Sequence, residues 1–266
     1  MFPGLFPQVL GCGLEGNMSY YDMEIIDGIN AYEFLTKVVP EHEIDEIIKF
    51  KSRLVKAMER IHGIGIQTKK CNFHLYYKEE IERKLYDCQS NIFFFDLIKH
   101  PTVDFGGEFV PSFFHVMKEY EKIFLVISSK NEIRETFSHG NMTLENIMYN
   151  RESGKITFID PYEENIIDSK WCDYSQILQS CNSFYEVYNE GEPQFIPKQL
   201  LTFNKIFKEF LNEDSAYNSQ LVRLFEISQF IRMLPFKMTT DEKGMSFFYK
   251  YASKLFYNFQ KQWNGR

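Results

Sequence analysis

The spacing of apolar residues predicts a chain that is mostly helical after a short β-rich beginning. Two β-like segments open the chain, Phe6 to Leu10 and Ser19 to Ile26, and the stretch Gly11 to Asn17 between them suits a turn. From Glu43 to His62, apolar residues recur at three- and four-residue steps, which predicts a long amphipathic helix that ends at Gly63. The change of period marks the passage from a strand pair to a helical body.

The rest of the chain keeps helical spacing, with one interruption. Further helices are predicted over Tyr77–Asp87, Ser112–Ser128, Asp173–Tyr188, Pro197–Leu211, Gln220–Leu234 and Asp241–Trp263. Pro197 suits the first turn of its helix, and Thr240 suits an N-cap. In the interruption, β-type residues at Asn146 to Tyr149 and at Lys155 to Ile159 flank a turn and predict a hairpin. The region Gln89 to Gly107 is the least readable part.

Composition narrows the class of partner. The chain has 266 residues, of which 17% are aromatic, so it can bury one large core or two unequal lobes. The formal net charge is −7, and the basic residues are scattered among acidic ones, which disfavours nucleic acid or an anionic membrane as a partner. A cationic or neutral small molecule fits better.

The five cysteines and the N-terminus point to a cytoplasmic location. The cysteines form no C-x-x-C pair and no metal-ligand spacing with the six histidines, which is typical of reduced thiols. No apolar run approaches the length needed to cross a bilayer, and the first ten residues lack the basic flank and cleavage site of a secretory signal. We therefore expect a cytoplasmic protein without a membrane partner.

A polar motif surrounds the predicted internal hairpin. His139-Gly140-Asn141 leads into it, Asn146 follows five positions after Asn141, and Ile159-Asp160-Pro161 follows its second strand. The residues before the first strand of a hairpin and those after its second strand lie at the same end of the hairpin. We therefore expect Asn141, Asn146 and Asp160 to converge. Amide and carboxylate oxygens there suit Mg²⁺ ions that bridge nucleotide phosphates. Either half alone is typical of an ordinary turn, but the two in this order predict a phosphotransferase site.

One residue of the motif departs from what phosphoryl transfer requires. Kinase-like enzymes place an Asp at the position of Asn141, where it accepts the proton of the substrate hydroxyl. A carboxamide has no basic lone pair at neutral pH, so Asn141 can orient a hydroxyl without taking its proton. Loss of a general base typically lowers the rate by a factor of about 10²–10⁴. Fold and activity are therefore separate questions.

The motif resembles that of the aminoglycoside phosphotransferase and choline kinase group of small-molecule kinases. Their loop reads His-Gly-Asp, with an Asn five positions after the Asp. The resemblance implies an α+β, protein kinase-like fold with a truncated β-containing N-terminal lobe and a large, mainly helical C-terminal lobe. It implies ATP and Mg²⁺ as cofactors, with Asn146 and Asp160 as metal ligands. Asn141 would orient the substrate, and His139 would be a member of the catalytic loop.

The same resemblance extends to the segment Tyr21 to Gly28, which looks like the family's strand and hinge for adenine. Met23 would be the gatekeeper, and the Glu24 carbonyl and Ile26 N–H would meet the adenine edge. Residues 1–28 would then be a remnant of the N-terminal lobe with the hinge, and residues 29–266 the helical C-terminal lobe. The strands that carry the phosphate-covering loop and the phosphate-binding Lys would be absent. ATP would then lack the contacts that these elements make to its phosphates.

The sequence Gly11-Cys12-Gly13-Leu14-Glu15-Gly16 has the spacing of a glycine-rich phosphate loop. A dinucleotide site requires a helix from the third glycine, whereas Asn17 to Ile26 is β-like. A kinase loop would need a phosphate-binding Lys on a strand, but the candidate, Lys37, follows a helical pattern. We therefore favour a turn.

Two classes of function remain open. The first is an ATP- and Mg²⁺-dependent phosphotransferase, with impaired activity, that acts on a hydroxyl of a sugar, amino alcohol or aminoglycoside. The second is a catalytically inactive, kinase-fold binding or scaffold protein, that is, a pseudokinase. An incomplete gene product, with the missing strands encoded upstream, is a third reading. The substitution Asn141→Asp separates the first class from the second.

Overall fold

The computed structural model describes residues 4–16, 18–64, 70–130, 133–189 and 195–264. Its contacts divide the chain into two compact units. The first comprises Met1–Ile66, Thr136–Glu163 and Gln176–Tyr217, and the second comprises Gln67–Glu135, Glu164–Ser175 and Asn218–Arg266. Helix α7 (Lys170–Cys181) contributes its first half to the second unit and its last half to the first. A lobe boundary between residues 28 and 29 stays a prediction.

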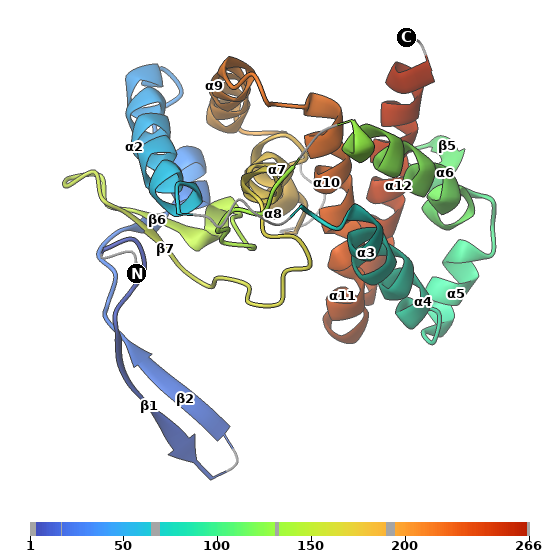
Figure 1. The fold of residues 1–266 in the computed structure, drawn as a ribbon, viewed down its shortest axis with the longest axis horizontal. Coiled ribbons are helices and arrows are strands. Elements are labelled where there is room, and N and C mark those ends of the chain that lie inside the picture. Colours follow the sequence, from blue (N-terminus) through green and yellow to red (C-terminus); the bar gives the residue numbers. More distant parts are fainter. Residues whose placement is uncertain (1–3, 17, 65–69, 131–132, 190–194, 265–266) are drawn as a thin grey trace. The chain divides into compact units, whose positions relative to one another are not determined.

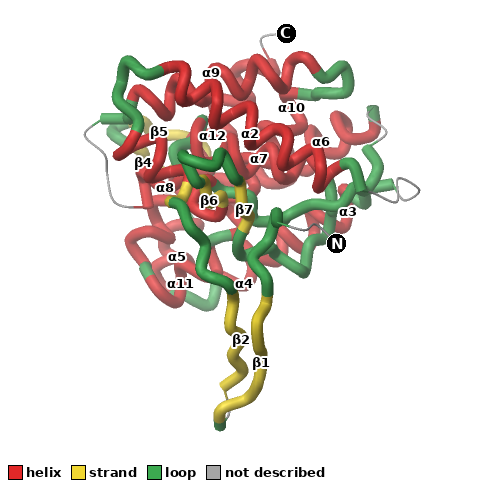
Figure 2. The backbone as a smooth tube through the Cα atoms, turned by 90° about the vertical axis from the view of Figure 1, so that its left-hand side faces the viewer, coloured by secondary structure: helices red, strands yellow, loops and turns green. Residues whose placement is uncertain are grey.

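The first unit begins with an antiparallel hairpin of β1 (Val9–Glu15) and β2 (Met18–Met23), which projects from the rest of the unit (Figure 1, Figure 2). The prediction of a first strand over Phe6 to Leu10 and a turn from Gly11 was wrong, because β1 continues through Gly11 and Gly13. Tyr20 lies opposite Gly13, and its ring occupies the space that a Cβ there would need. The chain reverses after Gly16, which has φ +63°, while residue 17 lies outside the described part.

A second, internal sheet has the order β3-β6-β7, with β3 (Ile29–Asn30), β6 (Ile147–Tyr149) and β7 (Ile156–Phe158) all antiparallel. The predicted internal hairpin is confirmed by β6 and β7. Gly28, with φ +146°, leads into β3, and a Cβ there would lie 2.7 Å from the Tyr149 carbonyl oxygen. Only glycine therefore lets the chain approach β6 this closely.

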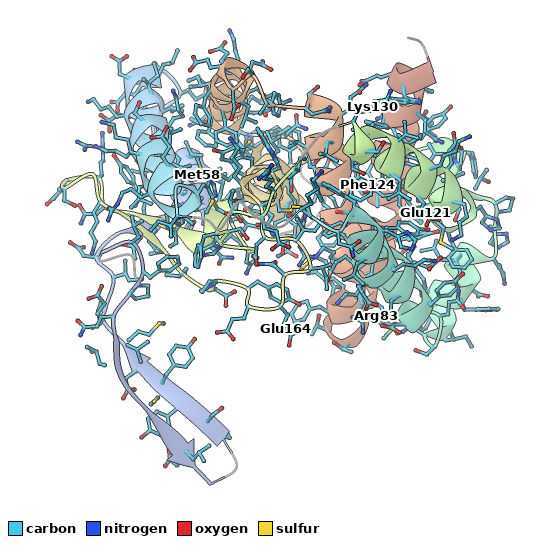
Figure 3. The ribbon with its side chains drawn as sticks, viewed as in Figure 1. Met58, Arg83, Glu121, Phe124, Lys130 and Glu164 are labelled. Carbon is cyan, nitrogen blue, oxygen red and sulfur yellow. The ribbon has the colours of Figure 1, made fainter. Side chains whose placement is uncertain are left out.

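The first unit also contains the helices α1 (Ala31–Glu33), the π-helix Phe34–Val38, α2 (Ile44–His62), the 3-10 turn Leu144–Asn146, the end of α7, α8 (Tyr185–Asn189) and α9 (Lys198–Glu213). Of these, α1, α2 and the 3-10 turn before β6 contact the internal sheet. The predicted helix over 43–62 is confirmed, and the apolar residues of its inward face, among them Met58 (labelled in Figure 3), are buried, whereas Ile44 and Ile48 are exposed. A single helix over Asp173–Tyr188 was wrong. Phe184, with φ +55°, separates α7 from α8, because left-handed backbone interrupts a right-handed helix.

The second unit is mainly helical and has an aromatic core. Its helices are α3 (Phe73–Tyr76), the π-helix Tyr77–Arg83, α4 (Lys84–Cys88), α5 (Ile92–Ile98), α6 (Phe113–Ser129), α10 (Ser219–Arg232), α11 (Leu234–Thr240) and α12 (Glu242–Asn264), with a hairpin of β4 (Thr102–Phe105) and β5 (Glu108–Pro111). Phe124 of α6 is fully buried within this unit (Figure 3), and its ring centroid lies 5.4 Å from that of Phe225.

Two expectations for this unit need correction or completion. The stretch Gln89 to Gly107, which had no readable period, forms α5 and the first part of the β4–β5 hairpin. Thr240 was expected to cap the last helix but instead ends α11, and the Asp241 side chain accepts the Gly244 N–H at 2.9 Å. Among the described residues, no helix combines the length and apolar character that a membrane span requires.

Candidate active site

The three polar residues predicted to converge do so in the first unit. Asn141 Nδ2 donates hydrogen bonds to Asp160 Oδ2 at 2.9 Å and to the Asp160 carbonyl at 3.2 Å. Asn146 Nδ2 donates to the Asn141 carbonyl at 2.9 Å. The loop before β6 and the turn after β7 therefore form one cluster.

The turn that carries Asp160 has an unusual backbone. Asp160 has φ +55°, a left-handed conformation that costs a non-glycine residue about 1–3 kcal/mol and that clusters at functional sites, although Asp tolerates it better than most residues. Backbone hydrogen bonds hold the turn on both sides, from Ile159 N to the Asn146 carbonyl at 3.0 Å and from Tyr162 N to the His139 carbonyl at 3.0 Å. The surrounding structure thus fixes a strained residue against the loop.

The hydrogen bonds also fix which way the carboxamide of Asn141 faces. Both Asp160 oxygens can only accept, so the Asn141 amide nitrogen must face them and its Oδ1 points away. Within the described part of the chain, Asn146 Oδ1 and Asp160 Oδ1 accept no hydrogen bond. An amide oxygen and a carboxylate oxygen with spare acceptor capacity are the donor set that Mg²⁺ prefers.

His139 is fully buried next to the loop that carries Asn141. Its Nδ1 accepts the backbone N–H of Asn141 at 3.3 Å. Its ring lies 5.7 Å from the ring of Phe158 and stacks on Phe6, with centroids 5.9 Å apart and planes 9° from parallel. Its place in the core and its bond to the loop backbone suit a member of the loop framework.

Sequence reasoning missed the residue of α7 that holds the loop. Gln176 is buried, its Oε1 accepts the Met142 N–H at 2.7 Å and its Nε2 donates to the Gly140 carbonyl at 2.5 Å. One side chain therefore replaces the backbone partners that this loop segment lacks. The available signal was the set of polar residues within the predicted helix over Asp173–Tyr188, Gln176 among them.

A second anchor holds the loop one step further along. Leu144 N–H donates to Ser180 Oγ at 3.0 Å, and Ser180 Oγ donates to Glu186 Oε1 at 2.6 Å. Glu186 is fully buried on α8, and burial raises its pKa to about 7, although the Ser180 hydrogen bond opposes this rise. The loop thus rests on a buried carboxyl group that titrates near neutral pH.

The predicted hinge residues lie at the end of β2. Met23 pairs with Val9 and is 43% exposed, and the Glu24 N–H donates to the Gln8 carbonyl at 2.9 Å. The Glu24 carbonyl and the Ile26 N–H make no hydrogen bond within the described ranges. No hydrogen bond of the described residues joins this segment to the loop and turn, so the structure assembles Asn141, Asn146 and Asp160 but not the hinge.

Lys37 lies outside the cluster. It belongs to the π-helix Phe34–Val38, and its ammonium group is paired with Glu33 at 3.0 Å on the surface. The expectation that Lys37 is helical is confirmed.

Comparisons with known proteins give a fold and no family. No protein-family model matches the chain, and no curated protein matches it. Among solved structures, Plasmodium vivax ethanolamine kinase is 11% identical with a TM-score of 0.48, over 97% of this chain and 68% of that one. A glucosamine kinase in complex with glucosamine, ADP and inorganic phosphate is 8% identical with a TM-score of 0.50, over 96% of this chain.

The second of these likenesses identifies the fold. The chain has an α+β, protein kinase-like fold, with small sheets and a large helical body, as the motif predicted. It spans 64% of the length of the glucosamine kinase. Activity and substrate are not carried over by a likeness at this identity.

Proposed function

We propose that this chain is a Mg²⁺-nucleotide-dependent phosphotransferase of the small-molecule kinase type, which transfers the γ-phosphate of ATP slowly to a hydroxyl group. The observation that carries the proposal is the cluster in which Asn141, Asn146 and Asp160 are joined by hydrogen bonds of 2.9 Å. The kinase-like fold supports the same conclusion.

Asn146 and Asp160 would hold the metal through their unengaged oxygens. A bound Mg²⁺ would supply positive charge to the phosphates, which is the main requirement of a loose phosphoryl-transfer transition state. The hydrogen bond from Asn141 and the backbone bonds on both sides of the turn hold the Asp160 carboxylate at the loop, so little reorganisation would be needed when a ligand binds.

The adenine would bind at the end of β2. The Glu24 carbonyl and the Ile26 N–H are an acceptor and a donor without partners in the described structure, which is the pair that an adenine edge requires. The bond from Glu24 N to Gln8 fixes the opposite edge of this segment. Met23 would lie beside the base as the gatekeeper.

Asn141 would orient the acceptor hydroxyl. Its Nδ2 is engaged with Asp160, so its Oδ1 is left to accept a hydrogen bond from the substrate. The hydroxyl proton would then pass to water instead of to a side chain, so transfer should be slower than with an Asp at this position by a factor of about 10²–10⁴.

A second candidate function is a nucleotide-binding protein of kinase fold that has lost transfer. The contact between Asn141 and Asp160 favours it, because the carboxamide donates a hydrogen bond to the proposed metal ligand. An Asp at the same position would instead place two carboxylates within 3 Å, an arrangement that a cation must relieve.

The variant Asn141→Asp decides between the two. ATP turnover would be measured with ethanolamine, choline, glucosamine and an aminoglycoside as acceptors, with Asp160→Ala as the inactive control. If the rest of the site is competent, Asn141→Asp should raise turnover with one acceptor about 10²-fold or more. No gain in a variant that still binds Mg²⁺-ATP would reject the phosphotransferase and leave the binding protein.

A further inference from the structure

The residues just before β1 touch both halves of the candidate site. Leu5 is buried, and its carbonyl accepts the Phe158 N–H at 2.7 Å. Phe6 stacks on His139 and also lies 6.1 Å from the ring of Phe158. This contact joins positions more than 130 residues apart in the sequence, and nothing in the local pattern of apolar residues predicted it.

The two residues contacted by this segment, Phe158 and His139, each precede a residue of the candidate site by two positions in the sequence. Phe158 precedes Asp160 by two positions at the end of β7, so the Leu5 carbonyl fixes the strand that carries this carboxylate. His139 precedes Asn141 by two positions and accepts its backbone N–H. The ring of Phe6 is therefore stacked on His139, the residue that accepts the backbone N–H of Asn141.

We propose that Phe6 is a positioning residue for this site. By stacking on His139 it keeps Asn141 in hydrogen-bonding distance of Asp160, while Leu5 holds the strand that ends at Asp160. The inference rests on the proposed function of the Asn141 and Asp160 cluster and assigns it a support from the N-terminal segment. Misplacement of a site by about 1 Å can cost about 10²-fold in activity, so support of this kind has a measurable effect.

The following strand provides a contrast within the same segment. Val9, Leu10 and Leu14 of β1 are 57%, 65% and 79% exposed, whereas Leu5 is 3% exposed. Leu5 is thus buried and Phe6 half-buried where the segment contacts His139 and Phe158, whereas these three side chains of β1 are exposed. Leu14 is apolar, exposed and at the far end of β1, and it serves as the matched control.

Two measurements on the full chain test the proposal. The first is the affinity for Mg²⁺-ATP by calorimetry, and the second is the NMR resonance of the His139 ring, which the face of a stacked aromatic ring shifts. The variants are Phe6→Ala, Phe6→Leu, Phe6→Tyr and Leu14→Ala, with Asp160→Ala as the binding control. Phe6→Leu removes the aromatic ring but keeps most of the side-chain volume, so it separates the loss of stacking from a general loss of stability.

We expect Phe6→Ala and Phe6→Leu to weaken Mg²⁺-ATP binding about tenfold and to move the His139 resonance. Phe6→Tyr should keep the wild-type affinity and the wild-type His139 resonance, because it keeps the stacked ring. Leu14→Ala should change neither quantity. Unaltered affinity in Phe6→Ala and Phe6→Leu, in a protein whose binding is lost in Asp160→Ala, would overturn the positioning role and leave the proposed function standing. Absence of binding in the wild type would reject the proposed function itself. An unmoved His139 resonance in Phe6→Leu would still overturn the stacking on its own.

Discussion

The first unit contains two antiparallel hairpins with opposite environments. In the β6–β7 hairpin Ile147 and Phe158 are fully buried, and helix α7 holds the loop that precedes it. In the β1–β2 hairpin every residue of β2 is exposed, and Leu14 of β1 is 79% exposed. The polar cluster flanks the buried hairpin, and the candidate adenine groups, on Glu24 and Ile26, follow the exposed one.

The two halves of the proposed nucleotide site, the metal-binding half and the adenine-binding half, therefore differ in how much buried structure supports them. The metal half rests on buried side chains and on hydrogen bonds to the loop backbone, so its geometry is present before a ligand binds. The adenine half belongs to a two-stranded hairpin, which has marginal stability by itself and two open edges. We therefore expect phosphate and metal contacts to dominate affinity for a nucleotide.

The largest difference should appear when one apolar residue of each hairpin is removed. Phe158→Ala deletes a fully buried ring and should lower the free energy of unfolding by about 3–5 kcal/mol. Leu14→Ala removes a side chain that is already in water and should change it by less than about 0.5 kcal/mol. Urea unfolding measures both, and equal losses would contradict the contrast.

The next largest effect concerns the buried carboxyl group under the loop. The pKa of Glu186 is about 7 in the folded chain against an ordinary 4.5, so the folded state keeps a proton that the unfolded state releases between these pH values. The stabilising contribution of this group is therefore complete below pH 4.5 and is lost as the pH rises through 7.

Glu186→Gln should remove this pH dependence. Relative to this variant, the wild type should lose roughly 3 kcal/mol of unfolding free energy between pH 4.5 and pH 8. Unfolding curves of the two proteins at several pH values give the difference directly. Parallel pH profiles would show that Glu186 titrates normally.

A smaller effect should distinguish two glycines with positive φ. Gly28→Ala brings a Cβ to 2.7 Å from the Tyr149 carbonyl and should cost about 2–3 kcal/mol. Gly16→Ala, at the tip of the exposed hairpin, has no atom within 4 Å of the new Cβ and should cost about 1 kcal/mol for the left-handed backbone alone. Thermal unfolding measures the loss of stability in both variants. A larger loss for Gly16→Ala than for Gly28→Ala would contradict the view that the β1–β2 hairpin is the less constrained of the two.

The smallest effect is expected at Lys37. Its ion pair with Glu33 is exposed, so Lys37→Ala should change stability by no more than about 0.5 kcal/mol and leave Mg²⁺-ATP affinity unaltered. Calorimetry of this variant tests whether Lys37 is a phosphate ligand after all. A loss of affinity of tenfold or more would restore it to the site.

Much of the fold was accessible from the sequence where one period ran without interruption. The predictions for α2, α6 and the β6–β7 hairpin were correct because their apolar residues face a core at regular steps. The break between α7 and α8 escaped because a single residue, Phe184, adopts a left-handed backbone that no apolar period records. The glycines of β1 escaped for a similar reason, since Tyr20 fills the space over Gly13 across the strands.

In the candidate site, too, the sequence predicted what is local in the chain and not what depends on distant contacts. Convergence of Asn141, Asn146 and Asp160 was predictable, because a hairpin joins them in sequence. The supports from Gln176, Ser180 and Phe6 were not, because they come from distant positions and depend on tertiary packing. A sequence therefore indicates the groups of such a site more readily than the residues that hold them.

The proposed function requires that the cluster of Asn146 and Asp160 bind a nucleotide through Mg²⁺. It is tested most directly by calorimetric titration of ATP into the wild type and into Asp160→Ala, each with and without Mg²⁺. We expect ATP to bind the wild type only with Mg²⁺ and to lose this binding in Asp160→Ala. Binding that is the same in both proteins, or that does not depend on Mg²⁺, would contradict it.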